Sequence, residues 1–188
     1  INTIAKNSQT EFTLFVTKDV MLNLGMFGIE RFLQIAENSC AGMLYSDYNV
    51  MEGNRFTPNT LIDHQPGSVR DDFNFGSILF FNTKALKSAA QKCKKNYKYA
   101  GLYDLRLALS EKEKVIRIPE LLYNTVEKDD RKSGDKQFDY VNPKNRAVQL
   151  EMESAVTEHL KRIKAFLKPK FDKINFTDGA FKYEASVI

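Results

Sequence analysis

Apolar residues in the first fifty positions follow first the period of a strand, then that of a helix, then that of a strand again. Glu11 to Val16 is rich in phenylalanine and valine and predicts a buried strand. Gly25 to Asn38 predicts a helix, because its apolar residues recur every three or four positions on one face. Ala41 to Tyr45 predicts a second strand. Strand, helix and strand within roughly 35 residues is the length of a βαβ unit, so we expect two parallel strands of one sheet joined by a right-handed crossover.

A long polar segment, Asn49 to Asp72, interrupts this alternation. It predicts a loop with one short edge strand at Val50 to Phe56, and a loop of this length in a compact domain is more often functional than decorative. The pattern then predicts a strand at Phe75 to Asn82, a helix at Thr83 to Lys95 with Thr83 as candidate cap, a short helix or turn at Asp104 to Ser110, a strand at Val115 to Ile118 closed by Pro119, and an apolar stretch at Leu121 to Val126.

The last third of the chain alternates between polar and helical segments. Glu127 to Asn142 is strongly polar and predicts a mobile loop or lid. Asn145 to Leu167 predicts the longest helix, whose apolar stripe either covers the sheet or meets a partner. Lys170 to Glu184 predicts a linker with a short hairpin around Thr177 to Ala180. We therefore expect an α/β unit at 1–126, a loop and helix packed on it at 127–168, and a linker at 169–188 that leads into the first strand of a following domain.

Composition and charge narrow the classes of protein. Basic residues exceed acidic ones by 28 to 24, a net charge of +4 that is too small to predict a nucleic-acid partner. Lysines cluster at 92–98 and 161–170, either as solvated helix faces or as a patch for phosphates or an acidic membrane surface. No apolar run reaches about 18 residues and no signal peptide opens the chain, so we expect no membrane span and a cytoplasmic location, with a peripheral place on the inner face of the membrane left open. The two distant cysteines, Cys40 and Cys93, predict free thiols.

Motifs for nucleophilic hydrolases, kinases and dehydrogenases are absent from the sequence. Carboxylates at strand ends remain: Asp19 and Asp47 follow the first two predicted strands, and Asp71 and Asp72 precede the third. In an open α/β sheet, ligands bind beyond the carboxyl ends of parallel strands, where carboxylates can hold a divalent cation. The alternative is that Asp19 and Asp47 are ordinary turn residues.

Four segments in order carry a resemblance to a known family. They read Thr-Glu-Phe-Thr-Leu-Phe-Val-Thr-Lys-Asp at 10–19, Ala-Gly-Met-Leu-Tyr-Ser-Asp-Tyr at 41–48, Gly-Ser-Ile-Leu-Phe-Phe-Asn-Thr-Lys-Ala-Leu at 76–86, and Tyr-Asp-Leu-Arg-Leu-Ala-Leu at 103–109 followed by Ile-Arg-Ile-Pro-Glu-Leu-Leu-Tyr at 116–123. Their order resembles the family 2 glycosyltransferases, which have the GT-A fold, a Rossmann-like, mostly parallel sheet with flanking helices. A fifth segment, Glu184 to Ile188, resembles the first strand of such domains.

The resemblance implies a cytoplasmic enzyme of polysaccharide biosynthesis that moves a sugar from a nucleotide-sugar donor to a glycan or lipid-linked acceptor. It implies that Asp104 is the general base that takes the acceptor hydroxyl proton. It further implies that Asp19, together with Asp47, lies at the donor site, and that Asp19 binds a divalent cation, Mg²⁺ or Mn²⁺, which neutralises the leaving diphosphate. The alternative for Asp104 is a helix cap.

Two departures from the family leave a second hypothesis open. Where the family has a metal-binding Asp-x-Asp, this sequence has Thr17, Lys18 and Asp19, and its nucleotide-binding half is not visible before Thr10. We therefore expect a fragment of a multidomain protein, incomplete at its N-terminal side. It is either part of an active glycosyltransferase or a catalytically silent module that binds an acceptor glycan or docks on an adjacent active domain. A basic surface-binding module is a third hypothesis.

Overall fold

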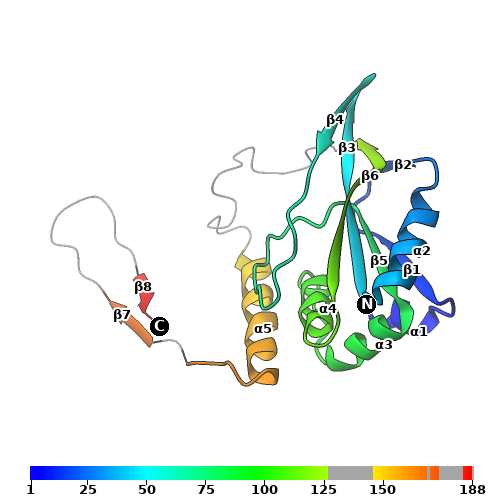
Figure 1. Cartoon of the computed structure of the whole chain (residues 1–188). Helices are drawn as coiled ribbons and strands as arrows, with labels where there is room; N and C mark the ends of the chain where they lie inside the picture. Colours follow the sequence, from blue (N-terminus) through cyan, green and yellow to red (C-terminus); the bar gives the residue numbers. More distant parts are fainter. Residues whose placement is uncertain (127–145, 169, 174–183, 188) are drawn as a thin grey trace, which may run out of the picture.

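A six-stranded mixed sheet with flanking helices forms the centre of the structure (Figure 1). This computed structural model describes residues 1–126, 146–168, 170–173 and 184–187. The elements are α1 (Asn2–Asn7), β1 (Phe12–Val16), β2 (Met21–Leu24), α2 (Gly28–Ser39), β3 (Met43–Glu52), β4 (Arg55–Asn59), β5 (Ile78–Asn82), α3 (Thr83–Lys92), α4 (Gly101–Ser110), β6 (Val115–Val126), α5 (Arg146–Arg162), β7 (Lys170–Lys173) and β8 (Glu184–Val187).

The sheet is mixed, which corrects the expectation of a mostly parallel one. Its strand order is β1-β5-β3-β6-β2, with β4 paired to β3. Among the described strands of this sheet only β3 and β6 pair in parallel, whereas β1 with β5, β3 with β5, β3 with β4 and β2 with β6 are antiparallel. Strands β1 and β3 do run in the same direction, but β5 lies between them. The apolar β5 returns from the long polar segment and pairs on both sides, so the predicted βαβ neighbours are separated.

Both faces of the sheet are covered by helices. Met43 pairs with Phe81 and Leu44 pairs with Phe80, so the side chains of Leu44 and Phe80 share one face. On that face Phe32 of α2 stacks on Phe80, with ring centroids 5.4 Å apart. On the opposite face, Met43 and Leu79 share the wall of a cavity with residues of α4, and α5 packs beside α4 (Figure 1). The structure thus confirms an α/β fold with flanking helices.

Most elements predicted between residues 11 and 126 are present, with three corrections. The predicted edge strand at 50–56 is wrong: β3 continues to Glu52 and turns at Gly53 into β4, which forms a hairpin within the segment expected to be a loop. The strand predicted at 115–118 does not end at Pro119: it continues through the apolar stretch at 121–126 as one strand, β6. The register with β3 shifts there and leaves Pro119 outside the ladder. The cap of α3 is Asn82, not Thr83, since its side chain accepts from two amides of the first turn.

The ends of the chain differ more from expectation. Helix α1 and strand β2 were not predicted, and α5 ends at Arg162, so Leu167 lies beyond the helix and is 72% exposed. The apolar stripe of α5 therefore packs only in part, around the fully buried Ala155. The two short strands β7 and β8 pair with each other. The predicted lid at 127–142 and the turn at 177–180 lie outside the described residues.

Gly76 sits where the long segment enters β5, and its backbone has a φ of +77°. A methyl group added there would overlap the Tyr123 hydroxyl. That hydroxyl accepts a hydrogen bond from the Ser77 amide at 2.8 Å, and the Tyr123 ring stacks on Tyr48. Glycine is thus required at this position both for its backbone conformation and for the close approach of Tyr123.

We predict that Gly76→Ala lowers the free energy of unfolding by about 2–4 kcal/mol, the sum of a left-handed backbone and an overpacked contact. Urea unfolding measures this loss. Gly53→Ala is the matched control, because Gly53 has a φ of +60° but no atom within 4 Å of the added methyl. The control should lose about 1–2 kcal/mol. Equal losses for the two variants would show that the contact with Tyr123 does not matter.

Candidate functional site

The segment from residue 60 to 77 has no helix or strand of its own, and side chains of the sheet hold its two ends. At its start, the Leu61 amide donates to Asp47 at 2.9 Å and the Tyr45 hydroxyl donates to the Ile62 carbonyl at 2.7 Å. At its end, the Ser77 amide donates to Tyr123. These bonds satisfy backbone groups that would otherwise be buried without partners.

The middle of the segment is held by α4. Arg106 donates from Nη1 to the Ser68 carbonyl at 2.8 Å and from Nη2 to the Arg70 carbonyl at 2.6 Å. Between them, the Tyr103 hydroxyl donates to the Val69 carbonyl. Three consecutive carbonyls therefore accept from two side chains one helical turn apart, which fixes the path of the backbone over α4.

Arg106 is a buried cation, with only 4% of its surface exposed. Burial lowers its pKa, although guanidinium remains protonated in proteins. Its charge lies 5.0 Å from the centre of the Tyr103 ring and 5.9 Å from that of Phe75. His64 Nε2 lies 3.5 Å from Arg106 Nη1, and burial followed by this positive charge lowers the pKa of His64. His64 is therefore neutral near pH 7 and can accept from the guanidinium.

A cavity of about 220 Å³ lies between the sheet, this segment and α4. That volume is below the roughly 300–1,000 Å³ of sites for drug-sized ligands, so the cavity suits one ring rather than a whole nucleotide sugar. Its wall combines aromatic and aliphatic side chains with three charged ones. The lining residues are Met43, Arg70, Asp71, Phe73, Phe75, Leu79, Tyr99, Leu102, Tyr103, Arg106 and Met152.

The sequence pattern predicts only part of this site. It places Asp71 just before a strand and predicts a function for the long polar segment at 49–72. Arg106 and Tyr103 were not assigned a role. A lone arginine within the apolar run Leu105 to Leu109 was the available signal, since a buried charge must find acceptors on other elements.

Asp47, predicted at the donor site, lies inside the sheet with 3% of its surface exposed. Arg117 donates to both of its carboxylate oxygens at 2.8 Å, and the Leu61 amide donates to one of them. Burial raises the pKa of Asp47, but the hydrogen bonds from Arg117 and Leu61 outweigh it and hold the pKa below its ordinary value. Both oxygens are thus taken by protein donors, and a role in donor binding stays a prediction.

Asp19, predicted as a metal ligand and at the donor site, is exposed in the turn between β1 and β2. Across the described ranges there is no group of three or more histidine, cysteine, aspartate or glutamate side chains that could hold a metal ion. A single carboxylate supplies few of the oxygens that Mg²⁺ or Mn²⁺ needs. The described residues therefore do not form a cation site at Asp19.

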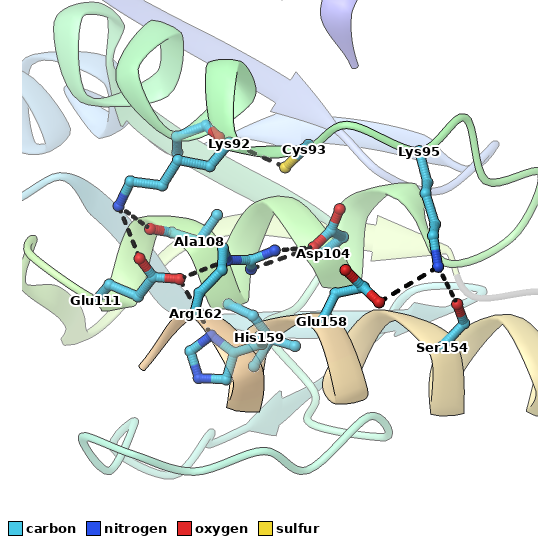
Figure 2. Close-up of polar contacts among 12 residues, drawn as sticks. Lys92, Cys93, Lys95, Asp104, Ala108, Glu111, Ser154, Glu158, His159 and Arg162 are labelled. Atoms are coloured by element: carbon cyan, nitrogen blue, oxygen red, sulfur yellow. Dashed lines mark hydrogen bonds and ion pairs between the residues drawn. The ribbon is translucent and has the colours of Figure 1, made fainter. Parts of the chain in front are cut away.

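Asp104, predicted as the general base, lies in the first turn of α4 and faces α5 (Figure 2). The residue is 3% exposed, and both terminal nitrogens of Arg162 lie 3.4 Å from its Oδ1. Helix α4 has its N-cap at Ala100 with no side-chain cap bond, so the alternative of Asp104 as a cap is wrong. The catalytic role stays a prediction, and in this structure Asp104 belongs to a buried ion-pair cluster.

Glu111 is the centre of that cluster. It accepts from Lys92 and from Arg162, each at 2.9 Å, and its Oε1 lies 3.3 Å from His159 Nδ1 (Figure 2). Nearby, burial and the carboxylate of Asp104 raise the pKa of Cys93 to about 12, so this thiol is not a nucleophile at neutral pH. Both cysteines are free, as predicted.

Comparisons with known proteins add no relative. No protein-family model matches the chain, and a search of curated proteins finds no similar protein. No helix in the described part of the chain is long and apolar enough to cross a membrane. The case for a function therefore depends on the residues and their geometry.

We predict that Asp47→Asn lowers the free energy of unfolding by about 2–3 kcal/mol, because Arg117 loses its charged bidentate acceptor. Asp63→Asn is the matched control: Asp63 also meets Arg117, at 3.1 Å, but its side chain is 82% exposed. Exposed ion pairs contribute about 0–1 kcal/mol. Denaturant unfolding of both variants tests the difference, and a control as damaging as Asp47→Asn would contradict it.

We also predict that stability falls as the pH drops below 6.5. Burial lowers the pKa of His159 from 6.5, with Glu111 opposing part of the effect. The unfolded chain therefore binds a proton before the folded one, so the stabilisation is complete above pH 6.5 and is lost as the pH falls toward the folded pKa. In His159→Gln the slope of unfolding free energy against pH, measured from 6.5 down to about 5, should be smaller. An unchanged slope would show that His159 does not cause the loss of stability at low pH.

Proposed function

We propose that this chain is the acceptor-side part of a family 2-like glycosyltransferase with a GT-A fold. The protein would move a sugar from a nucleotide-sugar donor to a hydroxyl group of a glycan or lipid-linked acceptor. The single observation that carries the proposal is the placement of the motifs. The four motif segments fall on β1, β3, β5 with α3, and α4 with β6, and these strands are four consecutive neighbours in one sheet.

The cavity beside α4 supports the acceptor side of the proposal. A sugar ring has an apolar face and a rim of hydroxyl groups. The aromatic wall, with Phe73, Phe75 and Tyr99, can cover the apolar face, while Arg70 and Asp71 can bind hydroxyls. The described residues do not form a cation site at Asp19, so the proposal assigns no step to a metal ion held by that residue.

A catalytically silent module is the second candidate, favoured by two specific observations. The carboxylate expected to act as base, Asp104, is held by Arg162 inside the protein. Asp19 belongs to no group of three or more possible metal ligands among the described residues. Such a module would bind an acceptor glycan in the same cavity or dock on an adjacent active domain. Chemistry separates the two candidates, because binding alone releases no nucleotide.

We predict that the full-length protein carrying this chain releases nucleotide from one class of donor when an acceptor is present. The measurement is nucleotide release from UDP-, GDP-, dTDP- and CMP-sugars, each with a panel of methyl glycosides. Acceptor-dependent release with one donor supports the proposed function. Binding of a glycoside without any release from any donor favours the silent module, and neither binding nor release overturns both.

A further inference from the structure

Asp71 differs from the other carboxylates near the cavity in having no ionic partner. It is exposed and lines the cavity, and no residue that the structure describes forms an ion pair with it. Its neighbour Asp72 is paired with Arg70 at 2.6 Å, and Asp47 and Asp104 are paired with Arg117 and Arg162. Asp71 is also the one acidic residue in the described wall of the cavity.

The backbone just before Asp71 is held in place by α4. The carbonyls of Ser68, Val69 and Arg70 accept hydrogen bonds from Arg106 and Tyr103. The three residues before Asp71 are therefore each fixed by a hydrogen bond to α4. Burial raises the pKa of Tyr103 to about 12, which keeps its hydroxyl protonated and able to donate. A carboxylate on an otherwise irregular segment is thereby given a defined position at the cavity, as a catalytic or binding group requires.

Asp71 interacts electrostatically with Arg70, Tyr103 and Arg106, and its negative charge opposes part of the effect of burial on the guanidinium of Arg106. Because Arg106 uses Nη1 and Nη2 on backbone carbonyls, it does not close Asp71 into an ion pair.

We propose that Asp71 is the general base of the acceptor site, and that the cavity it lines holds the ring of the acceptor sugar; this inference rests on the proposed function. The acceptor hydroxyl oxygen forms a bond to the anomeric carbon of the donor sugar. The bond from that carbon to the diphosphate oxygen breaks, and the diphosphate leaves with the electron pair. The hydroxyl proton passes to Asp71, which later gives it to water.

This assignment moves the base from Asp104 to a residue on another element. Tyr103 and Arg106, on either side of Asp104 along α4, line the cavity, whereas Asp104 itself does not and faces Arg162. A base must reach the proton it takes, directly or through one water. Asp71 lines the cavity in which the acceptor hydroxyl would lie, and Asp104 does not.

The test uses the full-length protein, the donor that supports release, and a methyl glycoside acceptor. Asp71→Asn should lower kcat by about 10²–10⁴-fold with little change in the KM for the donor, because the amide cannot take the proton. Asp72→Asn is the matched control, since it is the exposed neighbour paired with Arg70, and it should keep most of its turnover. Formate should restore part of the activity of Asp71→Ala and none of that of Asp72→Ala, a result that a merely structural role would not give.

The outcomes separate this inference from the proposed function. If the unmodified protein transfers sugar and Asp71→Asn is equally active, the assignment of Asp71 is wrong and the proposed function stands. If Asp104→Asn is inactive while its unfolding midpoint is unchanged and Asp71→Asn is active, the base is Asp104. If the unmodified protein transfers no sugar from any donor, the proposed function fails and this assignment fails with it.

Discussion

The guanidinium of Arg106 is the constraint on which the candidate site depends. An arginine within an apolar helix must find acceptors when the helix packs on a sheet, because an unpaired buried charge costs several kcal/mol. No carboxylate among the described residues pairs with Arg106, and the backbone carbonyls of Ser68 and Arg70 accept its hydrogen bonds instead. Arg106 can therefore be buried with α4 only if the 60–77 segment follows the path that brings these carbonyls to it. The same path leaves the cavity between the segment, α4 and the sheet.

At the two ends of the segment, side chains also bind its backbone, and here they come from the sheet. Asp47, Tyr45 and Tyr123 point from the sheet to the backbone of residues 61, 62 and 77. Side chains of the sheet and of α4 thus replace the hydrogen-bond ladder that the segment lacks. This explains how a long irregular stretch can present a carboxylate in a fixed place.

Local periodicity predicted much of the fold, and the pairing of strands could not be predicted in the same way. The helix at α2 and the strand at β5 follow from spacing and residue type. The place of β5 between β1 and β3 does not, because an apolar strand can pair with any other strand of similar length. For the candidate site, the pattern marked Asp47 as polar but could not show that Arg117, seventy residues away, occupies both of its oxygens.

The role of Asp104 also depends on a contact that the sequence could not predict. Its motif context predicts a general base, but its carboxylate lies beside Arg162 of α5, which is far from it along the chain. Asp71 was visible only as one of two adjacent acids. What distinguishes it from Asp72 is a single ion pair with Arg70, and that depends on side-chain positions rather than on sequence order.

The central claim is that the cavity between α4 and the 68–75 segment binds a sugar ring. Titration of the isotopically labelled protein with methyl glycosides, followed by two-dimensional NMR, tests it most directly. The account predicts that the amide and aromatic signals that shift belong to residues lining the cavity, above all Asp71, Phe73, Phe75 and Tyr103. Shifts confined to another surface, or no shifts with any glycoside, would contradict it.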